Sequence, residues 1–456
     1  MEPHGTDTTR NMARFACEFR LEDAPEGVAE NAKNAILDCL GVSVAASAHD
    51  MGRVARSFAA EAVAPGACSV WGTGIKAGPR DAALLNGMLA HGLDFDDLNH
   101  STTYLLAASF AVIEAYGLPG RRLLEAMIVG REVRYVLDGI FADRHAGIGP
   151  GARGWHPTGA LGSFAAAAAA SRALDLDLAG TTAAIGLGAG SCGALTRDGG
   201  TMAKPYRPGH VASAGIVAAL LAKHGATADD AIIEGRAGLL DAIGIPEGVA
   251  VATGSDLGRK FNLQSPIKAK KYPSAAAAHA PLEALLRLRE THRLTPEAIE
   301  RIELDLKART ALRDYPETGF EGLFSLRFCM AAGFVHGGLG PGHFSSACVN
   351  DPAVQEVMRR IGDAPGSLSV EVVLKSGDRL IEPLGERPSL STRREIEDKF
   401  RRCAETVLAA AQAEAAIKAV GDLENAPSIR DLAEAVTLRP VEARGGSRAA
   451  VGSRSL

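Results

Sequence analysis

The hydrophobic period of this chain changes twice along its length, and that pattern restricts the fold more than any other feature. From about residue 27 to residue 260, apolar residues recur at helical spacing, as the run Val28–Ala46 shows. Gly (51 residues) and Ala are abundant, whereas aromatic residues make up only 5% of the chain. Because small side chains let helices approach closely, we expect tightly packed helices and not an aromatic-rich β-sandwich.

A different pattern follows from about residue 266 and predicts strands. Apolar and polar residues alternate in Glu300–Ala308 and again in Leu368–Leu374, after which Ser376-Gly-Asp is placed for a hairpin turn. The helical spacing returns after residue 390, where Thr392 and Glu395 predict a capping box. We therefore expect a mainly α fold, in which both chain ends form a large all-helical domain and a smaller α+β domain is inserted between them.

These changes of period predict the domain boundaries. The first part of the helical domain would cover residues 11–266, the inserted α+β domain residues 267–390, and the C-terminal part of the helical domain residues 391–440. Residues 1–10 and 441–456 are mostly small or polar and have no hydrophobic period, so we expect disordered tails.

Composition excludes several classes of protein. The net charge is −5, so the chain lacks the basic surplus of a nucleic-acid-binding protein. The longest apolar stretch, Val211–Ala222, is too short to span a membrane, and the first residues lack the apolar core of a signal peptide. Seven scattered cysteines have no zinc-site spacing and predict reduced thiols. We expect a cytoplasmic protein that binds neither nucleic acid nor membranes.

The densest group of polar residues follows a predicted apolar helix. It holds three carboxylates, Asp94, Asp96 and Asp97, and two imidazoles, His91 and His100. Three interpretations are open. The group could be a solvated helix end capped by aspartates, the metal site of a helical enzyme that uses the His91–Asp97 cluster, or a metal-free site for acid/base chemistry.

Two further segments carry residues suited to an anionic substrate. His156 precedes a proline at the start of an Ala-rich helix, where the helix N-terminus lowers its pKa and favours the neutral ring. Thr201, Lys204 and Arg207 lie in a turn punctuated by Gly and Pro before an apolar helix. Cations beside a helix start are well placed to bind a carboxylate, because backbone N–H groups point the same way.

Lys270 and Lys271 belong to a basic run at the predicted domain boundary. Clefts often form between domains, although a run of lysines is usually only a solvated patch. Neither residue would stand out without the other segments.

Together these segments resemble the MmgE/PrpD family, which includes 2-methylcitrate dehydratases, cis-aconitate decarboxylases and an iminodisuccinate epimerase. The resembling stretches occur in the family's order: NGMLAHGLDFDD, GWHPTGALGS, GTMAKPYRPGH, KKYPSAAAAH, FSLRFCMAAGF and LSTRREIEDKF. The resemblance implies a helical domain built from both chain ends, an α+β lid domain between them, and a homodimer. It also implies a lyase or isomerase without cofactor or metal, which abstracts a proton beside a carboxylate of a small organic acid.

The resemblance implies roles for single residues as well. Asp94, His156, Lys204 and Lys270 match active-site residues of the family, and His100 matches a second histidine if about four residues are deleted after the DFDD run. In this hypothesis the lysines, joined by the nearby arginine, hold carboxylates and stabilise an enediolate-like charge. One of the two histidines moves the proton, and Asp94 orients or charges a neighbouring group.

Four positions depart from the family pattern. Leu98 stands where members often have Thr, Ala275 where the decarboxylases carry His, and Phe328, expected to line the substrate site, where they carry Tyr. These losses predict a drier pocket with fewer contacts for a tricarboxylate, and they argue against a standard decarboxylase or methylcitrate dehydratase. Arg207 stands where members often have His.

The residues therefore leave the outcome of the reaction open between dehydration, decarboxylation and epimerisation. A catalytically altered or inactive homodimer that binds a carboxylate is an alternative. A metal-dependent enzyme is another.

Overall fold

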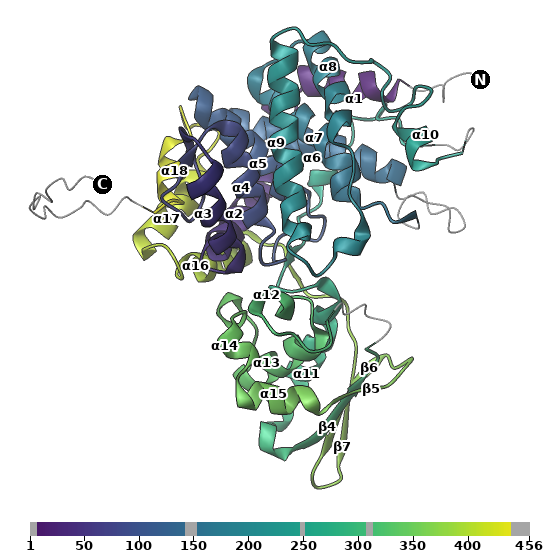
Figure 1. Cartoon of the computed structure of the whole chain (residues 1–456), viewed down its shortest axis with the longest axis vertical. Coiled ribbons are helices and arrows are strands. Elements are labelled where there is room, and N and C mark those ends of the chain that lie inside the picture. The colour runs from purple at the N-terminus through teal and green to yellow at the C-terminus, as the bar shows by residue number, and fades with distance from the viewer. Residues whose placement is uncertain (1–6, 142–152, 247–250, 307–312, 439–456) are drawn as a thin grey trace, which may run out of the picture.

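The computed structural model describes residues 7–141, 153–246, 251–306 and 313–438, which form two lobes (Figure 1). The larger lobe, called the helical lobe below, combines helices from both ends of the described chain. The smaller lobe, called the small lobe, comes from the residues between them and holds a sheet flanked by short helices. The mainly α fold that the sequence predicts is confirmed.

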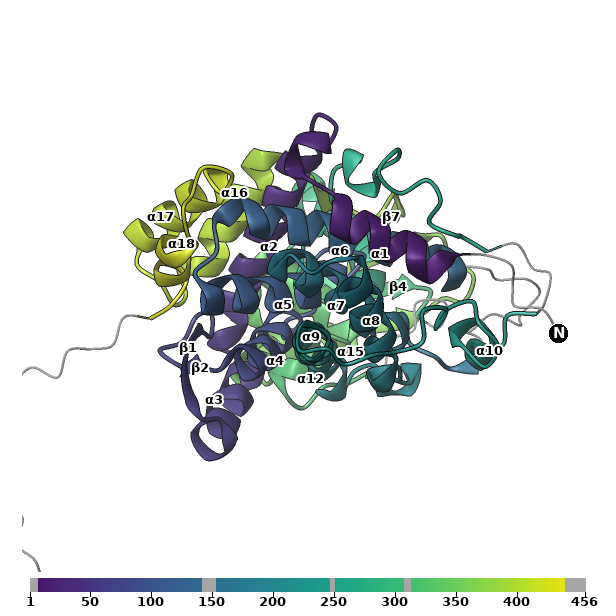
Figure 2. The ribbon, with the colours of Figure 1, turned by 90° about the horizontal axis from the view of Figure 1, so that it is seen from above.

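The helical lobe contains, in chain order, α1 (Thr8–Glu18), α2 (Val28–Ser47), α3 (Asp50–Ala62), a hairpin of β1 (Pro65–Ser69) and β2 (Lys76–Ala77), α4 (Pro79–Ala90), α5 (Ser101–Tyr116), α6 (Gly120–Phe141), α7 (Pro157–Leu174), α8 (Leu178–Gly188), α9 (Ala203–Lys223), α10 (Leu239–Ile243), α16 (Arg393–Ala404), α17 (Ala410–Gly421) and α18 (Arg430–Ala435). Figure 2 shows α9 end-on in the middle of this lobe, with α4, α5, α7 and α8 around it. None of the described helices has both the length and the hydropathy to cross a membrane.

Small residues bring α4 and α9 into backbone contact. A Cβ atom on Gly209 would lie 2.2 Å from the carbonyl oxygen of Leu84, and one on Gly87 would lie 2.6 Å from the Cα of Gly209. Only glycine fits at such a crossing, because real side chains do not approach that closely. This contact places the first turn of α9 beside the end of α4.

The C-terminal helices pack back onto α2 through a buried ion pair. The ammonium of Lys399 in α16 lies 2.7 Å from the carboxylate of Asp38 and donates to the carbonyl of Phe95 at 2.6 Å. The C-terminal part of the chain therefore supports the loop that follows α4. The predicted capping box at the start of α16 is confirmed, since Thr392 and Glu395 bond to each other's backbone N–H groups.

The small lobe contains α11 (His279–His292), β4 (Ile299–Leu304), α12 (Gly319–Gly322), α13 (Leu326–His336), α14 (Ser346–Val349), α15 (Pro352–Arg359), β5 (Ile361–Asp363), β6 (Ser369–Leu374) and β7 (Arg379–Pro383). Its sheet has the order β5-β4-β6-β7, with β4 and β5 parallel and the other pairs antiparallel. The alternating segments at Glu300–Ala308 and Leu368–Leu374 form β4 and β6, and the predicted hairpin joins β6 to β7; residues 307 and 308 lie outside the described residues.

The chain crosses between the lobes twice, and the two crossings pair with each other. β3 (Ala269–Lys270) is antiparallel to β8 (Ser389–Leu390), with Ala269 opposite Leu390. The predicted boundaries at residues 266/267 and 390/391 fall beside these strands. Movement of the small lobe as a lid, and the homodimer, stay predictions.

The predicted N-terminal tail is too long. Helix α1 begins at Thr8, and Thr8 and Thr9 are fully buried because Thr9 bonds to the carboxylate of Glu234. The polar sequence therefore hides a helix start that tertiary contacts hold. Residues 1–6 of this tail and the whole tail predicted at residues 441–456 lie outside the described residues.

Candidate active site

The carboxylate of Asp94 meets two ammonium groups in the loop after α4. The Nζ atoms of Lys204, in the first turn of α9, and Lys270, on β3, each lie 2.7 Å from its Oδ1. All three residues come from parts of the chain far apart in sequence. Burial opposes the charge on Asp94, but the two lysines outweigh burial and hold its pKa well below the ordinary value.

Lys270 and Lys204 differ in how far their donors are used. The ammonium of Lys270 also donates to the carbonyl of Asp94 at 2.8 Å and to the carbonyl of Ser274 at 3.3 Å, so its three N–H groups all have acceptors. Among the described residues, Lys204 has Asp94 as its one hydrogen-bond acceptor, and its Nζ lies 5.2 Å from the centre of the Phe324 ring. Phe324 belongs to the small lobe, so the site lies where the two lobes meet.

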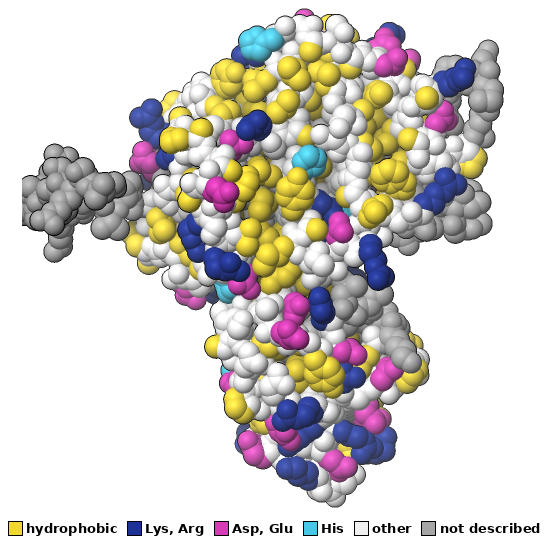
Figure 3. All heavy atoms as spheres, viewed as in Figure 1, with side chains coloured by type: hydrophobic (Ala, Val, Ile, Leu, Met, Phe, Trp, Pro, Cys, Tyr) yellow, Lys and Arg dark blue, Asp and Glu magenta, His cyan; other side chains and the backbone are white. Residues whose placement is uncertain are grey.

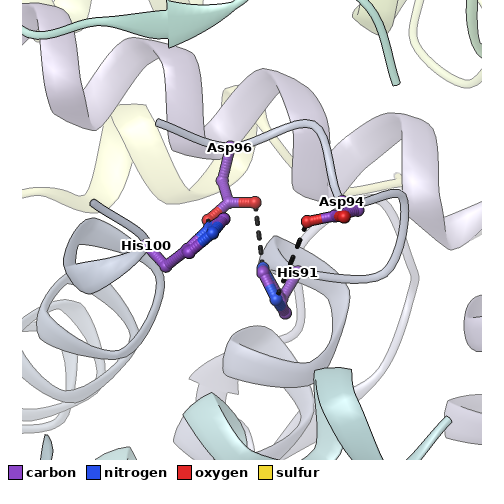
Figure 4. Close-up of side chains that lie close together, drawn as sticks. All are labelled: His91, Asp94, Asp96 and His100. Atoms are coloured by element: carbon purple, nitrogen blue, oxygen red, sulfur yellow. Dashed lines mark hydrogen bonds and ion pairs between the residues drawn. The ribbon is translucent and has the colours of Figure 1, made fainter. Parts of the chain in front are cut away.

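Asp96 lies between two imidazole rings (Figure 4). Its Oδ1 is 2.9 Å from Nδ1 of His91, and its Oδ2 is 2.8 Å from Nδ1 of His100. The rings themselves lie edge to face, with centroids 4.9 Å apart. Burial opposes the charge on Asp96, but the two imidazoles outweigh burial and hold its pKa well below the ordinary value. Because an ionised carboxylate only accepts, each Nδ1 carries a proton, and Nε2 of a neutral ring keeps its lone pair.

The two histidines differ in exposure. His91 is buried, and burial lowers its pKa to about 4, so its ring is neutral near pH 7. His100 precedes α5, and 27% of its side chain is exposed, so a substrate can reach its ring. Asp97 anchors the backbone here by accepting from the N–H groups of Asn99 and His100, each at 2.8 Å, and from Arg131 at 3.1 Å.

His156 caps the N-terminus of α7 and has the opposite arrangement. Its Nδ1 accepts from the backbone N–H of Thr158 at 3.2 Å, so the proton of the neutral ring is on Nε2. Burial, followed by the positive charge of Arg207, lowers its pKa to about 2. The ring is therefore a neutral hydrogen-bond donor near pH 7. The sequence predicts a neutral ring here because His156 lies at a helix N-terminus.

Arg207 lies one helical turn after Lys204 on the same face of α9. Its side chain is 5% exposed. Nη2 donates to the carbonyl of Leu195 at 2.9 Å and lies 3.3 Å from the carboxylate of Asp198.

Three residues expected to bind substrate lie elsewhere. Lys271 follows the last residue of β3, and its ammonium pairs with the carboxylate of Glu283 at 2.5 Å. Thr201 is exposed and bonds within its own turn. Phe328 is fully buried inside the small lobe, where its ring packs edge to face on that of Phe344. The structure does not bring these three side chains to Asp94.

Leu98 and Ala275, two of the residues that depart from the family pattern, form backbone hydrogen bonds between loops. Leu98 donates its N–H to the carbonyl of Lys268 at 2.9 Å, and Ala275 donates to the carbonyl of Leu323 at 2.8 Å. Both bonds hold loops at the junction between the lobes.

The ligand atoms of His91, Asp94, Asp96 and His100 lie within 4.8 Å of one another, a spacing that suits a metal ion. The charges favour a different use. The carboxylate of Asp94 is already paired with two ammonium groups, and that of Asp96 with two imidazole N–H groups. A cation would have to displace Lys204 and Lys270 and both imidazole protons, so the group is better satisfied as a hydrogen-bonded acid/base cluster.

Sequence reasoning missed the roles of Asp96, His91 and Phe324. The polar run shows that three aspartates are present, but not which one faces the imidazoles. The FSLRF stretch contains two phenylalanines, and the sequence does not show which one lies near the site. Helix α13 starts between them, and the ring of Phe324 is the one near Lys204. The proximity of Asp96 to the two histidines was the one available signal.

Comparison with known proteins gives matches along almost the whole chain. Residues 10–251 match the MmgE/PrpD N-terminal domain and residues 272–425 match the MmgE/PrpD C-terminal domain. The cis-aconitate decarboxylase of Mus musculus is 27% identical over 455 residues, covering 91% of this chain and 91% of that protein. The cis-aconitate decarboxylase of Homo sapiens is 27% identical over 446 residues (91% and 92%). The cis-aconitate decarboxylase-like protein oryM of Aspergillus oryzae is 26% identical over 484 residues (94% and 97%).

Proposed function

This chain belongs to the MmgE/PrpD family, and from that premise we propose that it is a cofactor-independent lyase. It moves a proton at the carbon beside a carboxylate of a small organic acid, and CO2 or water leaves. The cis-aconitate decarboxylases among its relatives support this class of reaction. The observation that carries the proposal is the Asp96–His100 pair beside the ion pairs of Asp94 with Lys204 and Lys270.

His100 is the residue that takes and returns the proton. Asp96 holds its Nδ1–H, so the lone pair of Nε2 is available, and the part of the ring that is exposed can reach a substrate. An aspartate that orients an imidazole in this way also stabilises the imidazolium that forms. His91 shares the same carboxylate but is buried, so it supports Asp96 and does not meet the substrate.

His156 and Lys204 stabilise the charge that develops. Removal of the proton leaves an enediolate whose oxygens need donors already in place. Lys204 has N–H groups that no described residue accepts from, and His156 offers Nε2–H from a ring that stays neutral. Lys270, with all donors used, keeps Asp94 in place.

Both outcomes balance with His100 as the proton carrier. In a dehydration the C–H bond breaks and the proton goes to Nε2; the C–O bond then breaks, and the leaving hydroxide takes that proton as water. In a decarboxylation Nε2 of His100 first takes a proton from solvent; the C–C bond then breaks, CO2 leaves with the electron pair retained on carbon, and that carbon takes the proton from the imidazolium, which restores the neutral ring.

Proton NMR of the purified protein in D2O tests the proposal. With cis-aconitate, citrate, 2-methylcitrate and malate, we expect deuterium at the carbon beside a carboxylate together with a product that has lost CO2 or water. The His100→Gln variant should be slower by about 10²–10⁴-fold, because a positioned base is lost. The His210→Gln variant, whose ring lies on Tyr206 away from Asp96, should keep the wild-type rate. No exchange and no product with any acid would contradict the proposal.

A further inference from the structure

Only one of the two lysines beside Asp94 has N–H groups that a ligand could bind. Lys270 spends its three N–H groups on protein oxygens, two from Asp94 and one from Ser274. Lys204 keeps donors that no described residue uses. A carboxylate placed beside Asp94 would therefore bind Lys204.

Arg207 is the second cation with unused donors. Its side chain is 95% buried, yet Nε and Nη1 have no hydrogen-bond partner among the described residues. Buried donors of a charged group are costly to leave unpaired, and such groups in native proteins normally have a partner. A carboxylate of a bound ligand is an acceptor that would pair with them.

Lys204 and Arg207 both lie near the His156 ring. Lys204 and Arg207 are one turn apart on α9, and among charged neighbours Arg207 has the largest effect on the His156 ring. The remaining basic residue of the predicted set, Lys271, is turned away toward Glu283.

From these contacts we infer that the site accepts a dicarboxylate, with Lys204 binding the carboxylate beside the reacting carbon and Arg207 binding the second carboxylate. This inference rests on the proposed function and names its substrate class. A third carboxylate would have no cation of its own among these side chains. It would also enter a site that already holds the buried charges of Asp94 and Asp96, which is unfavourable.

A purely structural role for Arg207 makes a different prediction. Its Nη2 bonds could simply hold the turn at Leu195 and Asp198. Loss of that role would weaken every ligand alike, whereas loss of a carboxylate partner would weaken only ligands that carry the second carboxylate.

Calorimetry with three unreactive acids separates these cases. Butyrate, succinate and tricarballylate carry one, two and three carboxylates. We expect succinate to bind the wild-type protein at least ten-fold more tightly than either other acid. The Arg207→Gln variant should lose about ten-fold or more in affinity for succinate, as for other charged hydrogen bonds, and change by less than two-fold for butyrate. Lys223→Gln removes a charge from the exposed end of the same helix and should match the wild type.

Tighter binding of tricarballylate than of succinate would overturn the inference, as would an equal loss for succinate and butyrate in Arg207→Gln. This outcome is independent of turnover. The exchange experiment in D2O decides the proposed function separately, since it asks for deuterium at carbon with any acid. Citrate is malate with an added carboxymethyl group. We therefore expect a higher kcat/KM for malate than for citrate, which extends the test from binding to turnover.

Discussion

The two lobes differ in surface and in what they contribute to the site. Figure 3 shows apolar side chains spread over the face of the helical lobe, whereas charged side chains gather on the lower part of the small lobe. The helical lobe supplies Asp94, Asp96, His100, His156, Lys204 and Arg207, all at the ends of helices whose backbones pack closely. Lys270 comes from a strand that joins the lobes, and the small lobe itself adds Phe324. The proposed chemistry therefore uses side chains of the helical lobe, and the small lobe contributes the Phe324 ring beside Lys204.

We expect the largest effect at Lys204, which lies in the site, and compare it with Lys271, which pairs with Glu283 outside the site. Lys204→Ala removes the ammonium with free donors, so kcat with the best acid of the NMR panel should fall by on the order of 10²–10³-fold. Lys271→Ala removes an outward ammonium paired with Glu283 and should change kcat by less than two-fold. Steady-state kinetics measures both, and equal losses would erase the distinction between the lobes.

Asp96→Asn tests positioning within the helical lobe. The amide cannot accept from both imidazoles and favours the wrong tautomer of His100, so we expect kcat to fall by about 10²-fold with little change in KM. The wild-type Asp97 bonds to the N–H groups of Asn99 and His100 and to Arg131, so Asp97→Asn should affect thermal stability more than kcat.

Gly209→Ala breaks the close crossing that positions the site. A methyl group 2.2 Å from the oxygen of Leu84 forces α4 and α9 apart, so we expect a loss of about 1–3 kcal/mol in the free energy of unfolding and a parallel drop in kcat. Gly342→Ala, in the small lobe with open space around the added methyl, should leave both unchanged. Chemical denaturation monitored by circular dichroism gives the first quantity.

Buried neutral histidines make both lobes sensitive to acid. Burial, followed by the positive charge of Lys270, lowers the pKa of His279 in the small lobe to about 4, and burial lowers that of His91 in the helical lobe to about 4. Above the ordinary value of 6.5 both states carry a neutral ring, so these groups contribute no pH dependence there. As the pH falls from 6.5 toward 4, the unfolded chain binds protons that the folded chain refuses, and the free energy of unfolding falls.

From pH 6.5 to pH 5, each buried ring should cost about 1–2 kcal/mol. Denaturation curves at both pH values measure the loss. His279→Gln should make the dependence shallower, and His224→Gln, an exposed residue, should leave it unchanged. A steeper curve for His279→Gln would contradict the assignment of a neutral ring.

We expect the smallest effect at Phe324, the residue that the small lobe places beside Lys204. Phe324→Leu removes the ring above Lys204 but keeps an apolar side chain, so kcat/KM should fall by less than ten-fold. A loss as large as that of Lys204→Ala would show that the small lobe takes a direct part in the chemistry. Phe320→Leu is the matched control, because Phe320 lies in the same segment and its ring packs at a tilt against that of Phe324.

The sequence predicted much of this architecture because hydrophobic period and capping are local properties. The strands β4 and β6, the capping box at Thr392 and the mainly α fold follow from the spacing of neighbouring residues. The residue types that now surround Asp94 were also visible in the sequence as four separate segments. The helix start at Thr8 was not, because contacts with Glu234, far along the chain, hold it.

By itself, then, the sequence determined the division into a helical and an α+β part, the family, and the residue types available for proton transfer. Long-range packing sets the bond between Asp96 and Nδ1 of His100, and it sets the bond that Nδ1 of His156 accepts from Thr158. It also leaves Arg207 with donors that no described residue pairs and brings Lys271 to Glu283. The physical reason is that a spacing rule places a side chain relative to its own helix or strand. Its hydrogen-bond partners, and with them its protonation, depend on which distant elements pack against it.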